Sequence, residues 1–469
     1  MDTAVSVSAS GAEPLSRAVL DDIGHNVFKC YQCVKCTSGC PLSDRFDLRP
    51  NQIMRGVQLN DVSVLDSRAI WLCANCQTCT TRCPQGIDVA GVMDVLRLEA
   101  QRRGLPSRVP EVQQFNKLFM HFVRWFGRIP ELLFILAYKV IRRDPFGDMG
   151  MGMRMLKKNK FRWIPQFART PKQVDRLADT TGKIAYFPGC AGESTARDYD
   201  ETVRTTAATL GLELVEPPGW VCCGSSCAHA TDKLEASALP LRTMATIERL
   251  GLDAVTSPCS NCFSRLKMAE RFGAEDDAAL ALVERDTGHK YRGTVGVQHF
   301  VDTLMQRVTP EKIRARVEKP LTGLKVACYY GCLITRPAEV TGAENPEYPM
   351  QMDYLLQALG ATTVDWSFKT DCCGGPLSVT QTELSLNLTK KIISNARDCG
   401  AEAIITMCPM CHMNLDARQA DLNLDFGVPI LHSTQLALLA FGKDAATAQL
   451  DKNIVDPKPL LKAKNLLCG

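Results

Sequence analysis

Hydrophobic positions after residue 183 fall into two successive series of short β-rich runs separated by longer helical stretches. The first series predicts strands over 184–187, 212–216 and 254–257 and helices over 199–210 and 234–250. The second predicts strands over 326–330, 362–366 and 403–407 and helices over 351–359 and 384–396. Because alternating strands and helices are typical of a helix-covered parallel sheet, each series is expected to fold as an α/β unit.

The stretch over 97–163 is predicted to be helical and is strongly basic. Apolar residues recur at helical spacing up to Gly127 and Pro130, which end that helix, and another helix is expected over 132–141. The glycine- and methionine-rich segment 147–155 is expected to be a hinge or loop. Over 97–163 the chain has fifteen Lys or Arg and five Asp or Glu, which leaves two interpretations open. The basic face is either the solvated side of a linker, or a docking surface for an acidic partner subunit or an anionic membrane surface.

The N-terminal part follows neither pattern. Residues 1–20 lack periodicity and are expected to form a disordered tail, and short helices are predicted over 51–59 and 67–72. Nothing near residue 1 resembles a signal peptide. No apolar stretch approaches the about eighteen residues of a membrane-spanning helix.

Composition excludes several classes of protein. Of the 469 residues, 45% are hydrophobic and 23% charged, as in an ordinary globular protein, and the net charge of +4 is too small to indicate a nucleic-acid partner. The 22 cysteines are the exception. In a chain without a signal peptide, cysteines grouped as C-x-x-C indicate metal or cluster ligands in a cytoplasmic protein rather than a disulfide framework.

Two cysteine runs near the N-terminus share the spacing C-x-x-C-x-x-C-x-x-x-C-P. In two-cluster bacterial ferredoxins the first three cysteines of such a run bind one cluster and the fourth binds the other. The predicted ligands of one cubane [4Fe-4S] cluster are Cys30, Cys33, Cys36 and Cys83, and those of the second are Cys73, Cys76, Cys79 and Cys40. Structural zinc needs only paired cysteines and leaves the third cysteine and the proline unexplained.

The two α/β series carry matching cysteine motifs in the order Gly-Cys, Cys-Cys-Gly and C-x-x-C. The repeated order indicates an internal duplication with a metal or cluster site in each copy. The predicted site residues are Cys190, Cys222, Cys223, Cys259 and Cys262 in the first copy and Cys332, Cys372, Cys373, Cys408 and Cys411 in the second. Five thiolates exceed the four that zinc or a cubane takes. They indicate a larger or unusual cluster, or a redox-active thiol beside a four-ligand site.

The other four cysteines are predicted not to be ligands: three are expected to be structural, and Cys468 is expected to be exposed to solvent. Cys227, Cys328 and Cys399 correspond to apolar or aromatic residues of the other copy, and a free cysteine packs as a small hydrophobe; Cys468 lies next to the end of the chain. The seven histidines show no paired spacing and are expected to make ordinary hydrogen bonds, although His412 follows a predicted ligand and could protonate a product thiolate.

The predicted architecture is α/β plus α-helical. It comprises a disordered tail (1–20), a helical two-cluster ferredoxin-like domain (21–104), a basic helical linker (105–180), a first cysteine-rich α/β domain (181–318) and a second with a C-terminal tail (319–469). No flavin or nicotinamide fingerprint is present, so electrons are expected to come from or go to partner subunits.

These motifs resemble heterodisulfide reductase. Tyr31 in the first run, and 70–76 with 82–84 in the second, resemble the family's C subunit, a two-cluster ferredoxin. Residues 183–461 resemble its B subunit, which carries two cysteine-rich "CCG" domains. Together they resemble a fusion of the two, like the D subunit of the membrane-linked form of the enzyme.

The resemblance implies a mechanism and a set of cofactors. Each CCG domain would bind a noncubane [4Fe-4S] cluster through its five cysteines, unless one half binds zinc or a single cubane instead. A disulfide between the two clusters would be reduced to two thiols, or formed in reverse, which makes the ten CCG cysteines the catalytic site. Electrons would pass through the two cubane clusters from a flavin-containing subunit like the enzyme's A subunit, or from a membrane cytochrome.

Other interpretations of the CCG signature stay open. It also occurs in subunits of glycolate, lactate and glycerol-3-phosphate oxidoreductases, so the alternative is an electron-transfer iron–sulfur subunit of such a dehydrogenase complex. A scaffold whose halves bind structural zinc is a third hypothesis. The expected location is the cytoplasm, with a partner able to tether the protein to a membrane.

Overall fold

The computed structural model describes residues 13–467 and divides the chain into two compact units. Unit 1 comprises Met1–Cys73 and Gln77–Pro110, and unit 2 comprises Ala74–Cys76 and Glu111–Gly469. Among the described residues no helix is long and apolar enough to cross a membrane.

Unit 1 is helical. Its longer helices are α1 (Leu15–Ile23), α3 (Pro50–Gln58) and α6 (Val89–Arg102), joined by the short helices α2 (Lys35–Ser38), α4 (Ala69–Leu72) and α5 (Thr78–Thr81) and the 3-10 turns η1 (Val27–Lys29), η2 (Ser43–Arg45) and η3 (Val62–Asp66). Asp88 precedes helix α6, and its carboxylate accepts a hydrogen bond from the Gly91 N–H at 2.8 Å and caps the first turn. Within α6 the buried Arg97 donates to the carbonyl of Cys73 at 2.7 Å and so fixes the loop that follows α4.

The prediction of a disordered tail is wrong for its last part. Helix α1 begins at Leu15, and the side chains of Leu15 and Val19 are fully buried. Ala18 is buried as well, so the apolar residues of this short helix share one face at helical spacing. One or two turns of sequence therefore already contain a signal for this helix, which the prediction of a tail overlooked. Residues 1–12 of the predicted tail lie outside the described part of the chain.

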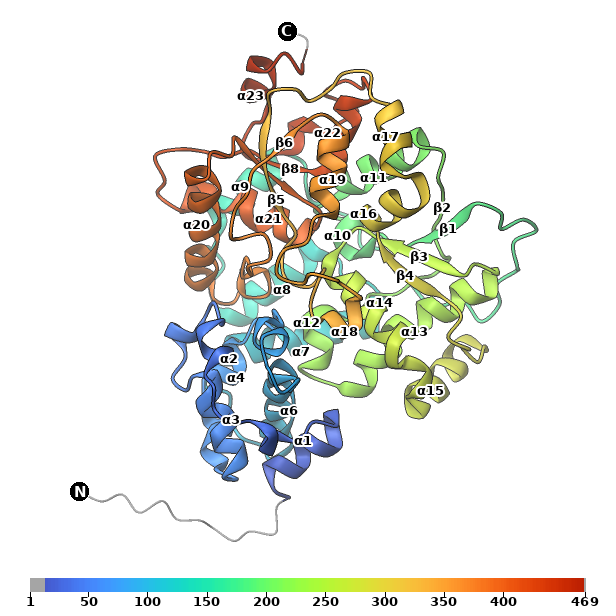
Figure 1. Cartoon of the computed structure of the whole chain (residues 1–469). Coiled ribbons are helices and arrows are strands. Elements are labelled where there is room, and N and C mark those ends of the chain that lie inside the picture. Colours follow the sequence, from blue (N-terminus) through green and yellow to red (C-terminus); the bar gives the residue numbers. More distant parts are fainter. Residues whose placement is uncertain (1–12, 468–469) are drawn as a thin grey trace. The chain divides into compact units, whose positions relative to one another are not determined.

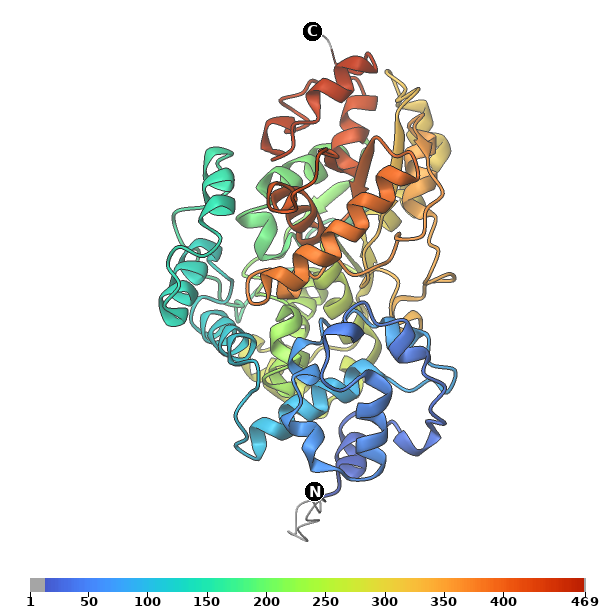
Figure 2. The ribbon, with the colours of Figure 1, turned by 90° about the vertical axis from the view of Figure 1, so that its left-hand side faces the viewer.

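Unit 2 begins with three helices, α7 (Pro110–Phe126), α8 (Glu131–Arg142) and α9 (Met149–Lys157), drawn in cyan in Figure 2. Helix α7 ends just before Gly127 and α8 begins just after Pro130, as predicted. The two helices pack through aromatic rings, with Phe134 edge-to-face on Phe115 at 5.0 Å between centroids. The same apolar cluster includes Val221, Cys222 and Leu239, so α7 and α8 dock on the first α/β half.

The prediction of a loop over 147–155 is wrong, because helix α9 occupies most of it. Glycine disfavours a helix by about 1 kcal/mol per residue. The helix forms nevertheless, because ion pairs with other segments of unit 2 stabilise it. Asp148 pairs with Arg418 and with Lys139, and Arg154 pairs with Asp421 at 2.8 Å. Arg418 and Asp421 are distant in the sequence, so these two pairs could not be inferred from local composition.

The rest of unit 2 consists of two parallel four-stranded sheets with the same topology (Figure 1). The first has the order β2-β1-β3-β4, formed by β1 (Lys183–Tyr186), β2 (Glu213–Val215), β3 (Ala254–Ser257) and β4 (Gly296–His299). The second has the order β6-β5-β7-β8, formed by β5 (Lys325–Tyr329), β6 (Thr362–Thr363), β7 (Ala403–Thr406) and β8 (Ile430–His432). The predicted α/β class and the six predicted strands are confirmed; the fourth strand of each sheet was not predicted.

Helices connect the strands in both halves. The first half has α10 (Gly189–Glu193), α11 (Arg197–Thr209), α12 (Ser225–His229), α13 (Lys233–Leu250), α14 (Ser260–Phe272), α15 (Asp277–Thr287), α16 (Phe300–Thr303) and α17 (Pro310–Ala315). The second has α18 (Ala338–Thr341), α19 (Gln351–Ala358), α20 (Thr382–Asp398), α21 (Pro409–Ala417), α22 (Ser433–Ala440) and α23 (Lys458–Ala463). The predicted helices correspond to α11, α13, α19 and α20.

The two halves share a buried interface. Helix α11 of the first half packs on α22 of the second, where the hydroxyls of Thr202 and Thr434 are 2.8 Å apart. The ring of Tyr199 stacks on that of His432 with centroids 3.7 Å apart. A further contact between the halves is the hydrogen bond of His299 to the carbonyl of Met407 at 3.0 Å. The carboxyl ends of both sheets therefore meet across this interface.

Candidate iron–sulfur sites

The five predicted cysteines of the first half follow three neighbouring parallel strands. Cys190 lies in α10 after β1, the Cys222-Cys223 pair follows β2, and Cys259 and Cys262 follow β3 at the start of α14. The structure brings all five together: Cys223 Sγ lies 3.5 Å from Cys262 Sγ, Cys222 hydrogen-bonds to Cys190, and Cys259 to Cys262. Ligands of open α/β sheets gather at this edge because the carboxyl ends of parallel strands meet there.

The second half repeats this arrangement with Cys332, Cys372, Cys373, Cys408 and Cys411. Cys373 Sγ lies 3.8 Å from Cys411 Sγ, Cys372 hydrogen-bonds to Cys332, and Cys408 to Cys411. All except Cys332 are buried.

A glycine before the first cysteine makes each set possible. Gly189 and Gly331 both have φ of +73°, and a Cβ there would lie 2.8 Å from Cys262 Sγ and 2.9 Å from Cys411 Sγ, respectively. The absence of a side chain lets the backbone approach the thiol of the C-x-x-C motif.

The two sets meet at one point. The side chains of Cys259 and Cys408 are hydrogen-bonded to each other, although they belong to different halves. The rings of Tyr199 and His432 lie close by, since the charges of Cys408 and Cys259 add to the effect of burial in raising the pKa of Tyr199 well above its usual value. The Tyr199 hydroxyl and His432 Nε2 are buried without a hydrogen-bond partner among the described residues.

The electrostatics of the thiols favour a cofactor that contains positively charged metal. Hydrogen bonding to Cys190 and burial raise the pKa of Cys222 well above its usual value, and hydrogen bonding to Cys373 does the same for Cys411. Hydrogen bonds from Cys222 and Cys262 instead lower the pKa of Cys223. Five crowded thiols in a dry site cannot all ionise by themselves, because like charges repel at low dielectric. A bound metal would supply the positive charge that stabilises these cysteines as thiolates.

The donor set fits an iron–sulfur cluster. No group of three or more His, Cys, Asp or Glu side chains within residues 13–467 is arranged to enclose a single metal ion. The site instead offers five soft sulfur donors per half, and thiolates are the ligands of iron–sulfur clusters. The Cys222-Cys223 and Cys372-Cys373 pairs place two such donors on adjacent residues.

In unit 1 the structure gathers one predicted ligand set. Cys30, Cys33, Cys36 and Cys83 line a single cavity together with apolar side chains that include Met54 and Ile87. Of the second set, Cys40 follows α2, Cys73 follows α4 and Cys79 lies in α5, whereas Cys76 belongs to the segment that groups with unit 2.

The two ferredoxin-type loops have the same backbone shape. Gln32 and Val34 adopt φ of 61° and 66°, and the equivalent Asn75 and Gln77 adopt 51° and 60°. A β-branched residue such as Val34 rarely takes this conformation, and strain of this kind concentrates at functional sites. Positive-φ turns present successive N–H groups to one side, which suits an anionic cluster.

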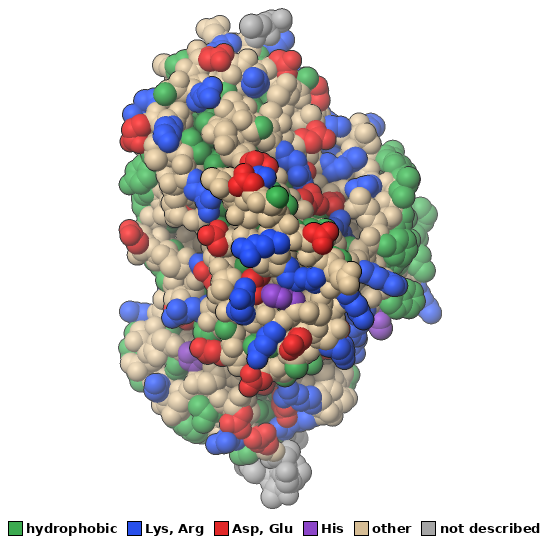
Figure 3. Space-filling model, turned by 90° about the vertical axis from the view of Figure 1, so that its right-hand side faces the viewer, with side chains coloured by type: hydrophobic (Ala, Val, Ile, Leu, Met, Phe, Trp, Pro, Cys, Tyr) green, Lys and Arg blue, Asp and Glu red, His purple; other side chains and the backbone are tan. Residues whose placement is uncertain are grey.

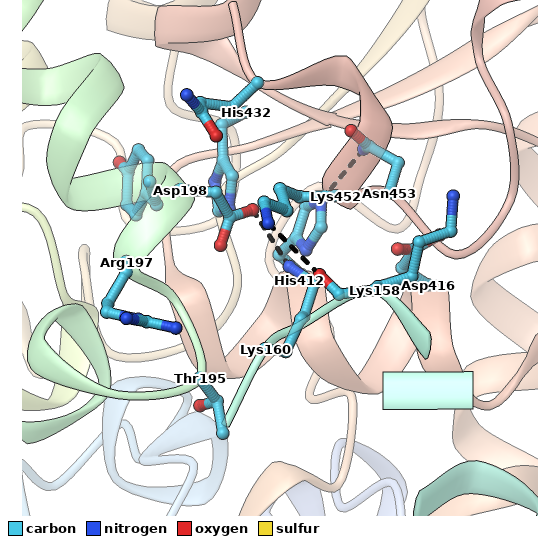
Figure 4. A network of polar contacts seen from close by, with 12 residues as sticks. Lys158, Lys160, Thr195, Arg197, Asp198, His412, Asp416, His432, Lys452 and Asn453 are labelled. Atoms are coloured by element: carbon cyan, nitrogen blue, oxygen red, sulfur yellow. Dashed lines mark hydrogen bonds and ion pairs between the residues drawn. The ribbon is translucent and has the colours of Figure 1, made fainter. Parts of the chain in front are cut away.

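His299 and His412 make hydrogen bonds, as expected, but the fold also places two histidines in equivalent positions, which the sequence did not predict. His299 and His432 end the fourth strands, β4 and β8, and occupy equivalent positions in the two halves. His412 does not have the properties of a proton donor. Burial lowers its pKa to about 3, and its Nε2 hydrogen-bonds to the carbonyl of Ile430 at 3.1 Å. Figure 4 shows it among buried polar side chains that include Asp416 and Asn453.

The three described cysteines outside the sets are expected to differ in reactivity. Cys227 and Cys328 are buried as predicted, which raises the pKa of each thiol. The prediction that Cys399 is packed in the core is wrong, because it is exposed directly after α20, at the end of the helix. Brief treatment of the native protein with a maleimide should therefore label Cys399 and leave Cys227 and Cys328 unmodified, because the thiolate is the nucleophile. Peptide mass mapping measures this. Labelling of Cys227 before Cys399 would contradict its assignment as a packed core residue.

Comparison with known proteins supports the cluster assignment. Residues 184–267 and 326–416 each match the cysteine-rich CCG domain family, and residues 26–87 match the 4Fe-4S dicluster domain family. The chain is 33% identical over 285 residues to the 8-methylmenaquinol:fumarate reductase membrane anchor subunit of Wolinella succinogenes, covering 59% of this chain and 99% of the relative. It is 29% identical over 283 residues to the B subunit of a CoB-CoM heterodisulfide reductase of Methanosarcina acetivorans, covering 58% and 94%. The chain belongs to the heterodisulfide-reductase-like family of iron–sulfur subunits.

Within that family the chain combines two parts. It is 35% identical over 102 residues to the C subunit of a heterodisulfide reductase of Methanosarcina mazei, covering 22% of this chain and 62% of the relative. The predicted resemblance to a fusion of C-like and B-like parts is thereby confirmed. A probable glycolate oxidase iron–sulfur subunit of Bacillus subtilis is 22% identical over 447 residues, covering 89% and 94%. The protein is an iron–sulfur electron-transfer subunit of an oxidoreductase.

Proposed function

We propose that this chain is the iron–sulfur catalytic subunit of a heterodisulfide-reductase-like complex. Electrons pass through two cubane [4Fe-4S] clusters to two noncubane clusters, which cleave a disulfide reductively or form it in reverse. The observation that carries the proposal is the meeting of two complete five-cysteine sets at Cys259 and Cys408. Two sites that meet in this way can each deliver one electron to the same S–S bond, whose cleavage needs two.

The chain's residues would hold and shield the reacting sulfurs. Bound clusters would supply one electron each, since cleavage of one S–S bond consumes two electrons and two protons and gives two thiols. Gly189 and Gly331 let the backbone approach the cysteines, and burial of the site keeps water from competing for them. Tyr199 and His432 carry buried polar atoms without partners beside Cys259 and Cys408, and these could orient a substrate sulfur.

The proposed partners follow from what the sequence lacks. With no flavin or nicotinamide fingerprint, the chain receives electrons from a flavin-containing subunit or a membrane cytochrome. Cysteine ligands in both ferredoxin-type runs provide the entry route.

A second function is favoured by a specific comparison. The identity to the fumarate reductase membrane anchor subunit, 33%, exceeds the 29% to the heterodisulfide reductase B subunit. Together with the likeness to a glycolate oxidase iron–sulfur subunit, this favours an electron relay between a quinone pool and a flavoprotein dehydrogenase. In that case the CCG sites pass electrons and cleave no disulfide.

Metal content is the first measurement, because one of its outcomes excludes disulfide cleavage. Anaerobically purified protein is expected to contain about 16 Fe and no Zn, as four [4Fe-4S] clusters require. About 12 Fe with one Zn would mean that one half is structural. That result would exclude symmetric disulfide cleavage and leave the relay function.

The second measurement is the reoxidation of protein that has been reduced with dithionite and freed of excess reductant. The visible absorbance of the protein monitors this reoxidation. Disulfides should reoxidise the wild type, and the Cys408→Ser variant should lose this reaction, whereas Cys399→Ser should keep it. If a menaquinone analogue reoxidises the protein and no disulfide does, the catalytic proposal is wrong.

A further inference from the structure

The exposed hydrophobic side chains of this protein are concentrated in one short segment. The described residues include twenty-two large hydrophobic side chains that are exposed, and twelve of them lie within 125–167. They are Trp125, Leu133, Leu136, Val140, Ile141, Phe146, Met149, Met153, Leu156, Trp163, Ile164 and Phe167. We call these twelve residues the linker patch. Single exposed hydrophobics are ordinary, but a contiguous set marks a surface that is covered in the working protein.

The patch follows the geometry of the helices. On α8 the exposed residues Leu133, Leu136 and Val140 are three and four positions apart, and on α9 so are Met149, Met153 and Leu156. This spacing places each trio on one face of its helix, opposite the side that is anchored to the rest of unit 2. Each helix is therefore amphipathic, with its apolar face outward.

The segment after α9 adds the aromatic part of the patch. The Ala168 N–H donates to the Phe126 carbonyl at 2.7 Å, and Phe167 stacks on Phe126 at 4.9 Å between centroids. These contacts hold the segment against the end of α7, beside Trp125. The side chains of Trp163, Ile164 and Phe167 are 67%, 76% and 75% exposed, respectively.

Basic side chains accompany the patch. Arg143, Lys157 and Arg169 are exposed and form no ion pair or side-chain hydrogen bond among residues 13–467. Figure 3 shows hydrophobic side chains gathered along one edge with Lys and Arg beside them, at the height where α8 and α9 stand out in Figure 2. Over 97–163 basic residues outnumber acidic ones by fifteen to five.

We propose that the linker patch inserts into the headgroup region of an anionic lipid bilayer and attaches the protein to the membrane surface. Apolar helix faces rimmed by Lys and Arg, with exposed Trp and Phe, have the chemistry of interfacial membrane binding. An acidic protein partner would be recognised by the same charges. It would not account for flexible aliphatic and methionine side chains exposed over two successive helices and the segment after them.

Tryptophan fluorescence gives a direct test. Of the five tryptophans, Trp71, Trp220 and Trp366 are buried, whereas Trp125 and Trp163 are exposed and both belong to the patch. Mixing the full-length protein with phosphatidylglycerol-containing vesicles should shift the emission to the blue, and lipids brominated near the headgroup should quench it. Pure phosphatidylcholine vesicles should bind more weakly, and salt should weaken binding to the anionic vesicles, because the Debye length falls from about 10 Å to about 3 Å between 0.1 and 1 M.

Variants separate insertion from unspecific adsorption. The double variant Trp163→Glu/Phe167→Glu should lower vesicle binding at least about tenfold, and Lys157→Glu by about fivefold on anionic vesicles only. The matched control is Phe272→Glu, an exposed aromatic on α14 outside the patch, which should bind like the wild type. Co-sedimentation provides the binding curve, and unchanged iron content shows that each variant is folded.

Two outcomes would overturn the proposal. One is no binding to anionic vesicles at low salt. The other is equal binding by the double variant and the wild type. If the protein binds no vesicles and instead holds an acidic protein partner through the linker patch, in a complex that persists at high salt, the surface is a protein interface. The proposal of membrane insertion is then wrong.

Discussion

Replacing Gly331 with alanine is expected to empty the cluster site of the second half, with loss of about four Fe per chain. A Cβ at this position would lie 2.9 Å from Cys411 Sγ, closer than atoms of these types approach in folded proteins. The thiol must move, and Cys411 is then displaced from Cys373 and Cys408. Iron, zinc and acid-labile sulfide analysis of the purified variant measures the loss.

The chain provides a matched control for this substitution. Gly342 has nearly the same conformation, with φ of +74°, but no atom lies within 4 Å of the position of its Cβ. Gly342→Ala therefore adds the strain of a left-handed residue, about 1 kcal/mol, without touching a thiol. Gly331→Ala should lose metal and Gly342→Ala should keep it. If both variants lose metal equally, backbone strain and not thiol placement is the cause.

The first half allows an independent repeat of the experiment. Gly189 has φ of +73° and its Cβ would lie 2.8 Å from Cys262 Sγ, whereas Gly182, with φ of +72°, has open space. Gly189→Ala is expected to lose the metal of the first half only. Loss of both sites from a single substitution would show that the two halves load cooperatively.

Motif spacing predicted most of the site because the information is local. A Gly-Cys pair, a Cys-Cys-Gly triplet and a C-x-x-C motif each fix their own cysteines at the end of one strand, and the parallel sheet then brings them together. The predicted set Cys30, Cys33, Cys36 and Cys83 surrounds one cavity for a similar reason, since three of its members share a loop.

What the sequence missed depends on distant contacts. The strands β4 and β8 have four and three residues, and they are defined by pairing with β3 and β7 rather than by their own pattern. The equivalence of His299 and His432 follows from sheet order, so spacing along the chain could not reveal it. Helix α9 forms despite its glycines because Arg418, 270 positions away in the chain, pairs with Asp148.

Lys160 is the strongest case of this kind, and replacing it with methionine is expected to destabilise unit 2 by about 3–5 kcal/mol. In the sequence it is one of many basic residues of the linker and would be taken as solvated. In the structure its side chain is 3% exposed, and its Nζ lies 2.9 Å from the carboxylate of Asp198, which is 4% exposed (Figure 4). Methionine keeps the volume and removes the charge, so a buried carboxylate is left without its cation.

A double-mutant cycle separates the ion pair from simple packing. Asp198→Asn should also destabilise the protein, and the double variant Lys160→Met/Asp198→Asn should recover part of the loss, because no unpaired charge stays buried. Lys157→Met, at an exposed position of α9, should change the free energy of unfolding by less than about 0.5 kcal/mol. Denaturant unfolding of anaerobically purified protein gives these values.

The consequence for the site follows from where the partners of Lys160 lie. Asp198 is on α11 of the first half, and the charge of Lys160 also acts on His412 and Asp416 of α21 in the second. Lys160 of the linker thus interacts with one helix of each half, α11 and α21, and each of these helices follows a cysteine of its own half. If Lys160→Met loosens this contact, reoxidation by a disulfide should slow more than the metal content falls, since each half keeps its own five thiols. A loss of metal in proportion to activity would instead show that the lysine is needed for folding alone.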